Sequence, residues 1–171
     1  MNLELMGVAA EVVGAAAVVA SLVYLAVQIR NSNRQDNIRA VQNTVQDFVN
    51  TYANVTATRT DADIFSRGLH NFDALEQADQ AVFHSKMQLL ASGFYQVLAM
   101  KEVGFLTDAA LFDKSESLFL SMIVSPGGNA WWQAYRHLPP EPLKEYIERR
   151  IVERGPQIRP AHQDQIWYRQ R

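Results

Sequence analysis

The feature that most constrains this chain is the apolar segment of residues 7–30, which reads GVAAEVVGAAAVVASLVYLAVQIR. As a helix, residues 5–29 would extend about 37 Å, which exceeds the roughly 30 Å of hydrocarbon in a bilayer. The uncharged part, residues 12–29, just reaches the length of about 18 residues that a span requires. We therefore expect this segment to cross a membrane as a helix.

Two other interpretations of an apolar N-terminal segment fit less well. A cleaved signal peptide begins with a basic region and ends at a small-residue cleavage site. The leader MNLELMGVAAE instead has two acids and no base, and no such site follows the apolar core. A helix buried in a soluble core needs protein on every side, and a chain of 171 residues offers little material to surround it. A retained span remains the leading interpretation.

The charges around the segment predict its direction. Arg30, Arg34 and Arg39 follow it, whereas Glu4 and Glu11 are the only charged side chains before it. The preference for positive residues on the cytoplasmic side then predicts an N-terminus outside and residues 30–171 in the cytoplasm.

Small residues recur within the span at spacings of three and four. The stripe consists of Gly7, Ala10, Gly14, Ala17 and Ser21. Such a stripe lets two helix backbones approach closely, which is how helices associate in lipid. A segment rich in alanine and glycine also produces this spacing by chance. We predict a helix–helix interface here and keep chance spacing as the alternative.

Glu11 lies at the flank of this stripe, inside the apolar segment. A carboxylate within a span is unfavourable, so it should either face a partner helix or remain near the outer headgroups. We include Glu11 in the predicted interface, with the headgroup position as the alternative.

A second stripe follows the polar neck NSNRQDN of residues 31–37. Its members, again spaced by three and four, are Ile38, Val41, Val45, Phe48 and Tyr52. The spacing is typical of a coiled-coil seam, on a helix continuous with the span. We predict that this stripe extends the helix–helix interface.

Helical periodicity continues through the rest of the chain, and no segment has the alternating pattern that predicts a strand. We expect helices over 61–72, 74–103, 108–124, 130–138 and 142–154, with caps at Thr60, Thr107 and Asn129 and a stop at Gly104. The predicted fold is all-α, an N-terminal transmembrane helix continuing into a cytoplasmic helical bundle. Its parts are a transmembrane segment (1–30), a juxtamembrane amphipathic helix (31–58), a bundle (59–155) and a basic tail (156–171).

The charge distribution bears on the partners. The net charge is −2, which does not predict a nucleic-acid binder, but residues 149–171 hold six arginines and two acids. Basic segments at both ends of an acidic body suit anionic lipid heads or an acidic protein surface. We predict that Arg30 and Arg34, and in the tail Trp167, Tyr168, Arg169 and Arg171, contact the membrane surface or a partner. We expect no nucleic-acid partner. The chain has no cysteine, which is compatible with a cytoplasmic location of the domain.

The adjacent pair Trp131 and Trp132 projects in two directions, because neighbouring helical positions point about 100° apart. We expect one indole in the core and the other at a partner or membrane surface.

No catalytic, cofactor or metal site emerges from the motifs. The four histidines stand at positions 70, 84, 137 and 162, without the spacing of a helical metal site. No serine lies in a G-x-S-x-G turn, and Gly127-Gly128 lacks the lysine of a phosphate loop. We therefore expect no cofactor and no enzymatic activity.

Several phrases carry a resemblance to a known family. The segments VVASLVYLAVQIRNSN, FSRGL, KEVGFL and SPGGNAWW, spread over residues 12–150, resemble a family of small bacterial single-span membrane-anchored helical proteins with no assigned activity. The resemblance implies a bacterial inner-membrane protein with a helical cytoplasmic domain. Glu11 and the tail after Gly155 are not features of that family.

These observations favour a protein that acts by association. The leading hypothesis is a single-pass scaffold that self-assembles, or an accessory subunit of a larger membrane complex. The alternative is a membrane-tethered sensor that holds a small apolar ligand between Phe83, Phe94, Phe119 and Trp131. A membrane-anchored enzyme is the third and least favoured hypothesis, which a cleft around His84 with acidic side chains would revive.

Overall fold

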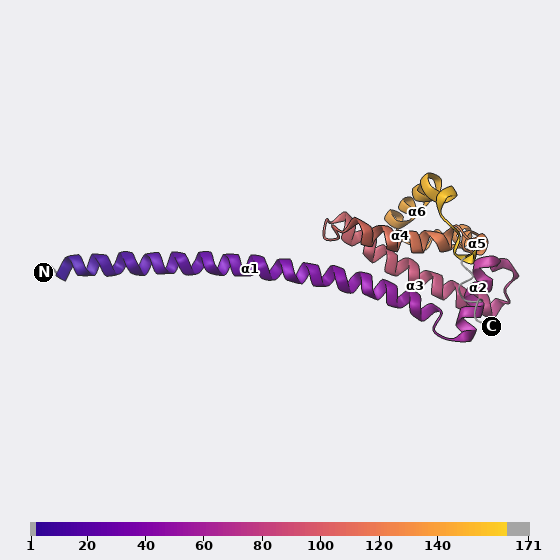
Figure 1. Cartoon of the computed structure of the whole chain (residues 1–171), viewed down its shortest axis with the longest axis horizontal. Coiled ribbons are helices and arrows are strands. Elements are labelled where there is room, and N and C mark those ends of the chain that lie inside the picture. Colours follow the sequence, from indigo (N-terminus) through magenta and orange to yellow (C-terminus); the bar gives the residue numbers. More distant parts are fainter. Residues whose placement is uncertain (1–2, 164–171) are drawn as a thin grey trace. The chain divides into compact units, whose positions relative to one another are not determined.

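The computed structural model describes residues 3–163, with side-chain environments given for Glu11 and from Gly14 onward. The described part is all-α (Figure 1). Its helices are α1 (Leu3–Val55), α2 (Arg59–His70), α3 (Gln77–Glu102), α4 (Ala109–Ile123), α5 (Pro126–Tyr135) and α6 (Glu141–Arg154), with 3-10 turns η1 (Phe72–Ala74), η2 (Gly155–Gln157) and η3 (Ala161–Gln163). The predicted all-α fold, with one N-terminal helix leading from the apolar segment into the bundle, is confirmed.

The chain divides into two compact units, Met1–Ala40 and Val41–Arg171. In the first unit every residue from Gly14 to Ala40 is exposed. Among the described residues, α1 is the one helix that is long and apolar enough to cross a membrane, and its apolar window is not buried. The segment has the length and composition of a membrane anchor or of a signal sequence.

The core of the second unit is built around α3. Phe83, Met87, Leu90 and Phe94 follow one another at spacings of four, three and four and are fully buried. Helical neighbours at this spacing share one face, so α3 presents a continuous apolar ridge to the helices around it. The helix ends as predicted, because Gly104 takes the left-handed conformation with φ 75°.

Helix α5 enters this core through two glycines. A Cβ at Gly127 would lie 1.8 Å from the carbonyl oxygen of Gly68, and a Cβ at Gly128 would lie 1.9 Å from that of Met122. Both neighbours are backbone atoms of other helices, α2 and α4, which cannot move aside as a side chain would. The first turn of α5 therefore sits in direct backbone contact with α2 on one side and α4 on the other.

The helix caps lie near the predicted positions but use different residues. Thr58 caps α2: its Oγ1 accepts a hydrogen bond from the Asp61 amide at 3.0 Å and donates to Asp61 Oδ2 at 2.7 Å. The predicted pair, Thr60 with Asp63, has the same spacing two residues later, and Asp63 instead pairs with Arg67. Helix α4 is capped by Asp108 rather than by Thr107, and α5 begins after Ser125 rather than after Asn129.

Candidate functional site

No other part of the described chain covers the predicted interface in the first half of α1. Glu11, Gly14, Ala17 and Ser21 are all exposed, and no atom lies within 4 Å of a Cβ built on Gly14. The Ser21 hydroxyl donates to the Ala17 carbonyl at 2.8 Å, so its polar group is satisfied within the helix. The other two members, Gly7 and Ala10, lie outside the residues whose surroundings the structure describes.

The second stripe divides between an exposed and a buried part. Ile38 is exposed, whereas Val41, Val45 and Phe48 are buried and Tyr52 is half-buried. The Phe48 ring packs 6.1 Å from that of Phe94 on α3. From Val41 onward the stripe is therefore covered by the chain's own bundle, and only its first member is left for a contact with another chain.

The expectation that one tryptophan of the pair faces a partner is corrected. Trp131 and Trp132 are both 1% exposed and belong to the core. The reason is the close approach of α5 to α2 and α4, which covers two sides of a short helix that the sequence alone would leave half at the surface. Of the other residues predicted to contact the membrane surface or a partner, Arg30 and Arg34 are exposed. The remaining four, Trp167, Tyr168, Arg169 and Arg171, lie outside the described residues.

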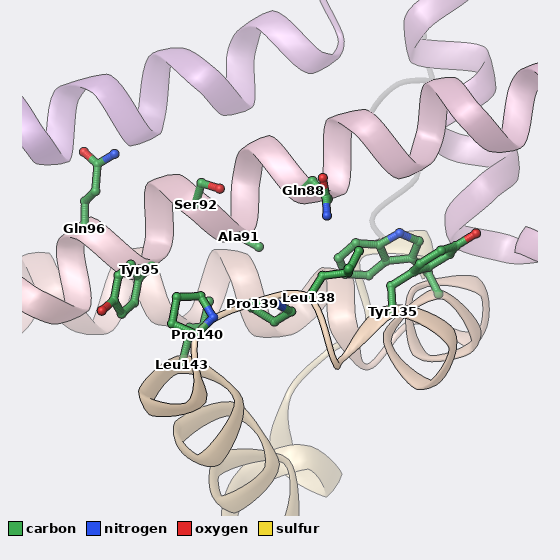
Figure 2. Close-up of a pocket in the computed structure, with 11 residues that line it drawn as sticks. Gln88, Ala91, Ser92, Tyr95, Gln96, Tyr135, Leu138, Pro139, Pro140 and Leu143 are labelled. Carbon is green, nitrogen blue, oxygen red and sulfur yellow. The ribbon is translucent and has the colours of Figure 1, made fainter.

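A pocket of about 260 Å³ opens between α3, α5 and the start of α6. Figure 2 shows Gln88, Ser92 and Gln96 spaced along α3, with the loop residues Leu138 and Pro139 lying across from the helix. The other lining residues are Ala91, Tyr95, Trp131, Tyr135, Pro140 and Leu143. None of the eleven is Asp, Glu, Lys, Arg or His, so the pocket combines amide and hydroxyl groups with apolar and aromatic walls and carries no charge.

His84 supports the aromatic end of this pocket. Its Nδ1 accepts a hydrogen bond from Trp131 Nε1 at 3.1 Å, and its ring lies 4.2 Å from the Tyr135 ring. Because Nδ1 is the acceptor, the proton of the neutral imidazole resides on Nε2. Partial burial lowers the pKa of His84, which favours this neutral form. His84 thus holds two lining residues in place without lining the pocket itself.

The aromatic residues between which the alternative hypothesis places a ligand pack against one another. Phe83, Phe94 and Phe119 are fully buried, and the rings of Phe94 and Phe119 stack with their centroids 5.0 Å apart. Of the four residues of that hypothesis, Trp131 is the one that reaches the pocket.

Glu116 forms a buried ion cluster between α4 and α6. It is fully buried and accepts hydrogen bonds from Arg150, from Arg154 Nη1 at 2.8 Å and from the Tyr146 hydroxyl. Burial alone would raise the pKa of Glu116, but the hydrogen bonds from Arg150 and Tyr146 and the charges of both arginines lower it overall. The two carboxylate oxygens of Glu116 both accept hydrogen bonds from residues of α6, so the cluster joins α4 to α6.

Two histidines meet where the C-terminal segment returns to the body. The rings of His70 on α2 and His162 on η3 are 5.1 Å apart, edge to face. His70 Nδ1 donates to the Ser66 carbonyl at 3.0 Å, and the His162 amide lies 3.4 Å from Ser125 Oγ. Within residues 3–163 no group of three or more His, Cys, Asp or Glu side chains is placed to hold a metal ion.

Two sequence patterns indicate the pocket and the ion cluster, although neither site was predicted. Gln88, Ser92 and Gln96 recur every fourth residue beside the apolar ridge of α3. Glu116 lies four residues after Phe112 and three before Phe119, so an acid stands in the apolar stripe of its helix. An ionisable residue at such a position requires a buried partner of opposite charge.

Comparison with known proteins gives no match: no protein-family model fits the chain, and neither a curated protein nor a solved structure is similar to it. The family that the sequence resembles is therefore not shown. The described part of the chain is all-helical, and its long apolar N-terminal helix has the length and composition of a membrane anchor or of a signal sequence.

Proposed function

We propose that the protein is a single-pass membrane protein that acts by association, as a self-assembling scaffold or as an accessory subunit of a larger membrane complex. The observation that carries the proposal is the complete exposure of residues 14–40 in a helix that is long and apolar enough to span a bilayer. Water is a poor environment for such a surface, and a bilayer together with a partner helix is a good one.

The direction of insertion follows from the flanking charges. Arg30 and Arg34 are exposed at the end of the apolar segment, where they suit the cytoplasmic headgroups of a bacterial inner membrane. The N-terminus then lies outside, and the second unit lies in the cytoplasm.

The stripe on α1 is suited to close helix contact. Gly14 leaves room for a partner backbone, since nothing within the chain lies within 4 Å of its Cβ position. The hydroxyl of Ser21 is already bonded within the helix, so lipid or an apolar partner leaves no donor unpaired. Association through this face needs no rearrangement of the chain.

Leucine substitutions on two faces of α1 test the proposal. Gly14→Leu with Ala17→Leu fills the stripe, whereas Ala16→Leu with Ala26→Leu adds leucine on the opposite side, by the advance of about 100° per residue. The first pair should reduce the mass of the detergent-solubilised assembly or release the protein from its complex, and the second pair should leave both unchanged. Equal masses for the wild type and the Gly14/Ala17 variant would reject association through the stripe.

A second candidate function is favoured by the pocket of about 260 Å³. Its volume lies just below the range of about 300–1,000 Å³ that is typical of small-molecule sites, and its walls are mainly apolar with a few amides and hydroxyls. A membrane-tethered module that binds a small uncharged ligand is the function that this pocket supports.

This candidate is tested with benzamide as an uncharged probe and benzoate as its charged counterpart. Saturation transfer from the full-length protein in nanodiscs should reach benzamide and not benzoate. Ser92→Phe, on an exposed lining position, should abolish the transfer, whereas Ser85→Phe, exposed on the same helix outside the pocket, should not. Transfer that survives Ser92→Phe, or that is as strong for benzoate, would assign the binding to another surface.

A further inference from the structure

The turn between α3 and α4 exposes two apolar side chains. Val103 is 63% exposed and Phe105 is 48% exposed, on either side of Gly104. Leu106 follows and is buried, so the turn is anchored from within while its tip stays bare. Gly104, with φ 75°, lets the chain reverse at this point and places both apolar residues at the tip.

The charged residue next to the tip is turned back onto the bundle. Lys101 Nζ lies 3.4 Å from the centroid of the Phe112 ring, which is the geometry of a cation–π contact. The exposed apolar side chains of the turn are Val103 and Phe105, with the exposed acids Glu102 and Asp108 on either side of them.

Contacts within the second unit show at which end of the bundle the turn lies. Lys86 Nζ donates to the Val55 carbonyl at 2.9 Å. Phe48, seven residues earlier on α1, packs against Phe94, eight residues later on α3. The segment 41–55 of α1 and helix α3 thus run antiparallel. The turn at 103–105 lies at the Val41 end of the bundle, and Val55 lies at the other end.

The Val41 end is also the end through which the bundle is tethered. Residues 30–40 connect it directly to the apolar segment that ends at Ile29. A membrane anchor in the first unit is therefore joined covalently to the second unit at its Val41 end. Valine and phenylalanine exposed at a tethered end suit the boundary between headgroups and acyl chains, where apolar side chains of peripheral segments insert.

We propose that the turn of residues 103–105 is a second membrane contact, in which Val103 and Phe105 touch the lipid headgroup layer. The inference rests on the proposed anchoring of α1 and adds to it a partner, the bilayer surface, for the cytoplasmic domain. Two contacts, the span and the turn, then limit how the bundle rotates above the membrane more than the span alone does.

The absence of cysteine from the sequence allows a direct test in the full-length protein. Single cysteines at Phe105→Cys, Tyr24→Cys and Val152→Cys are labelled with nitrobenzoxadiazole and reconstituted in vesicles of phosphatidylethanolamine and phosphatidylglycerol that carry a headgroup nitroxide quencher. Tyr24 lies in the apolar segment, and Val152, on α6, is 82% exposed and serves as the solvent control. All three positions are exposed within the chain, so the label does not disrupt the core.

The expected result is a blue-shifted emission and strong quenching at position 105, close to the values at position 24 and well above those at position 152. If position 24 is quenched while position 105 behaves like position 152, the turn does not touch the membrane and the inference is wrong. If position 24 itself is unquenched, the proposed membrane anchoring fails, which separates the two failures.

Discussion

The guanidinium of Arg150 donates two hydrogen bonds to the carboxylate of Glu116, from Nε to Oε1 at 2.6 Å and from Nη2 to Oε2 at 2.9 Å. The two residues are 34 positions apart in the sequence and join α4 to α6. Bidentate pairs of this kind are among the strongest hydrogen-bonded contacts in proteins. The last helix of the bundle is therefore held by a charged contact as well as by Leu143 and Ile147, which are fully buried.

Glu116→Ala should destabilise the fold, because it removes the buried carboxylate that Arg150 and Arg154 share and leaves Arg150 with its more exposed partner Glu153. Breaking a buried ion pair costs about 3–5 kcal/mol, and the partial exposure of both arginines should reduce the loss to about 2–3 kcal/mol. The matched control is Glu148→Ala at the surface pair with Arg136, where both side chains are more than a third exposed. That change should cost less than about 1 kcal/mol. Thermal unfolding followed by circular dichroism measures both, and equal losses would contradict a structural role for the cluster.

Gly127→Ala should disrupt the entry of α5 into the core. The new Cβ would lie 1.8 Å from a backbone oxygen of α2, so helices must separate to admit it. The expected loss is about 3 kcal/mol, at the upper end for overpacked cores. Gly155→Ala is the control, since its Cβ would meet Ile151 Cγ2 at an ordinary 3.6 Å. A stable Gly127→Ala protein with unchanged tryptophan fluorescence would show that the two helices are not in such close contact.

Acidification should weaken the wall of the pocket through His84. Its pKa in the folded protein is lowered by burial, below the unfolded value of about 6.5. The unfolded chain then binds the proton more readily, so the stability that neutral His84 contributes is present above about pH 6.5 and decreases as the pH falls below it. Protonation also replaces the Nδ1 acceptor of Trp131 by a donor.

The melting temperature should therefore fall between neutral and mildly acidic pH, and His84→Gln, whose amide oxygen can still accept from Trp131, should reduce the fall. Part of it should remain, because burial and, secondarily, the nearby His70 also lower the pKa of His162. Exposed His137→Gln is the control and should leave the pH profile unchanged. A profile that His84→Gln does not alter would contradict the proposed role of this residue.

Much of the fold could be predicted from local patterns. The continuous first helix, the long third helix and the stop at Gly104 follow from apolar spacing and from the conformational freedom of glycine, which are properties of short segments. The caps were displaced by one to four residues because several polar residues near each helix start can act as caps. TATRTDAD, for example, offers two threonines at the same spacing from an aspartate.

The environment of individual side chains could not be predicted in the same way. The burial of both Trp131 and Trp132 depends on contacts that Gly127 and Gly128 make with distant parts of the chain. The second stripe was predicted to contact another chain, but Val41 and Phe48 pack within the bundle of the same chain. Their periodicity predicts that this face of the helix is covered, but it does not predict which helix covers it. The pocket likewise arises only when residues of α3, α5 and the 138–140 loop meet.

The mass of the intact membrane assembly is the measurement that best distinguishes a protein that functions within an assembly from one that functions alone. The full-length protein is extracted from its membrane in polymer nanodiscs, and the protein mass of the intact particle is determined together with the identity of its chains. We expect a particle that contains two or more chains, either copies of this protein or this protein with other membrane subunits. A particle that contains a single copy and no other protein would contradict it.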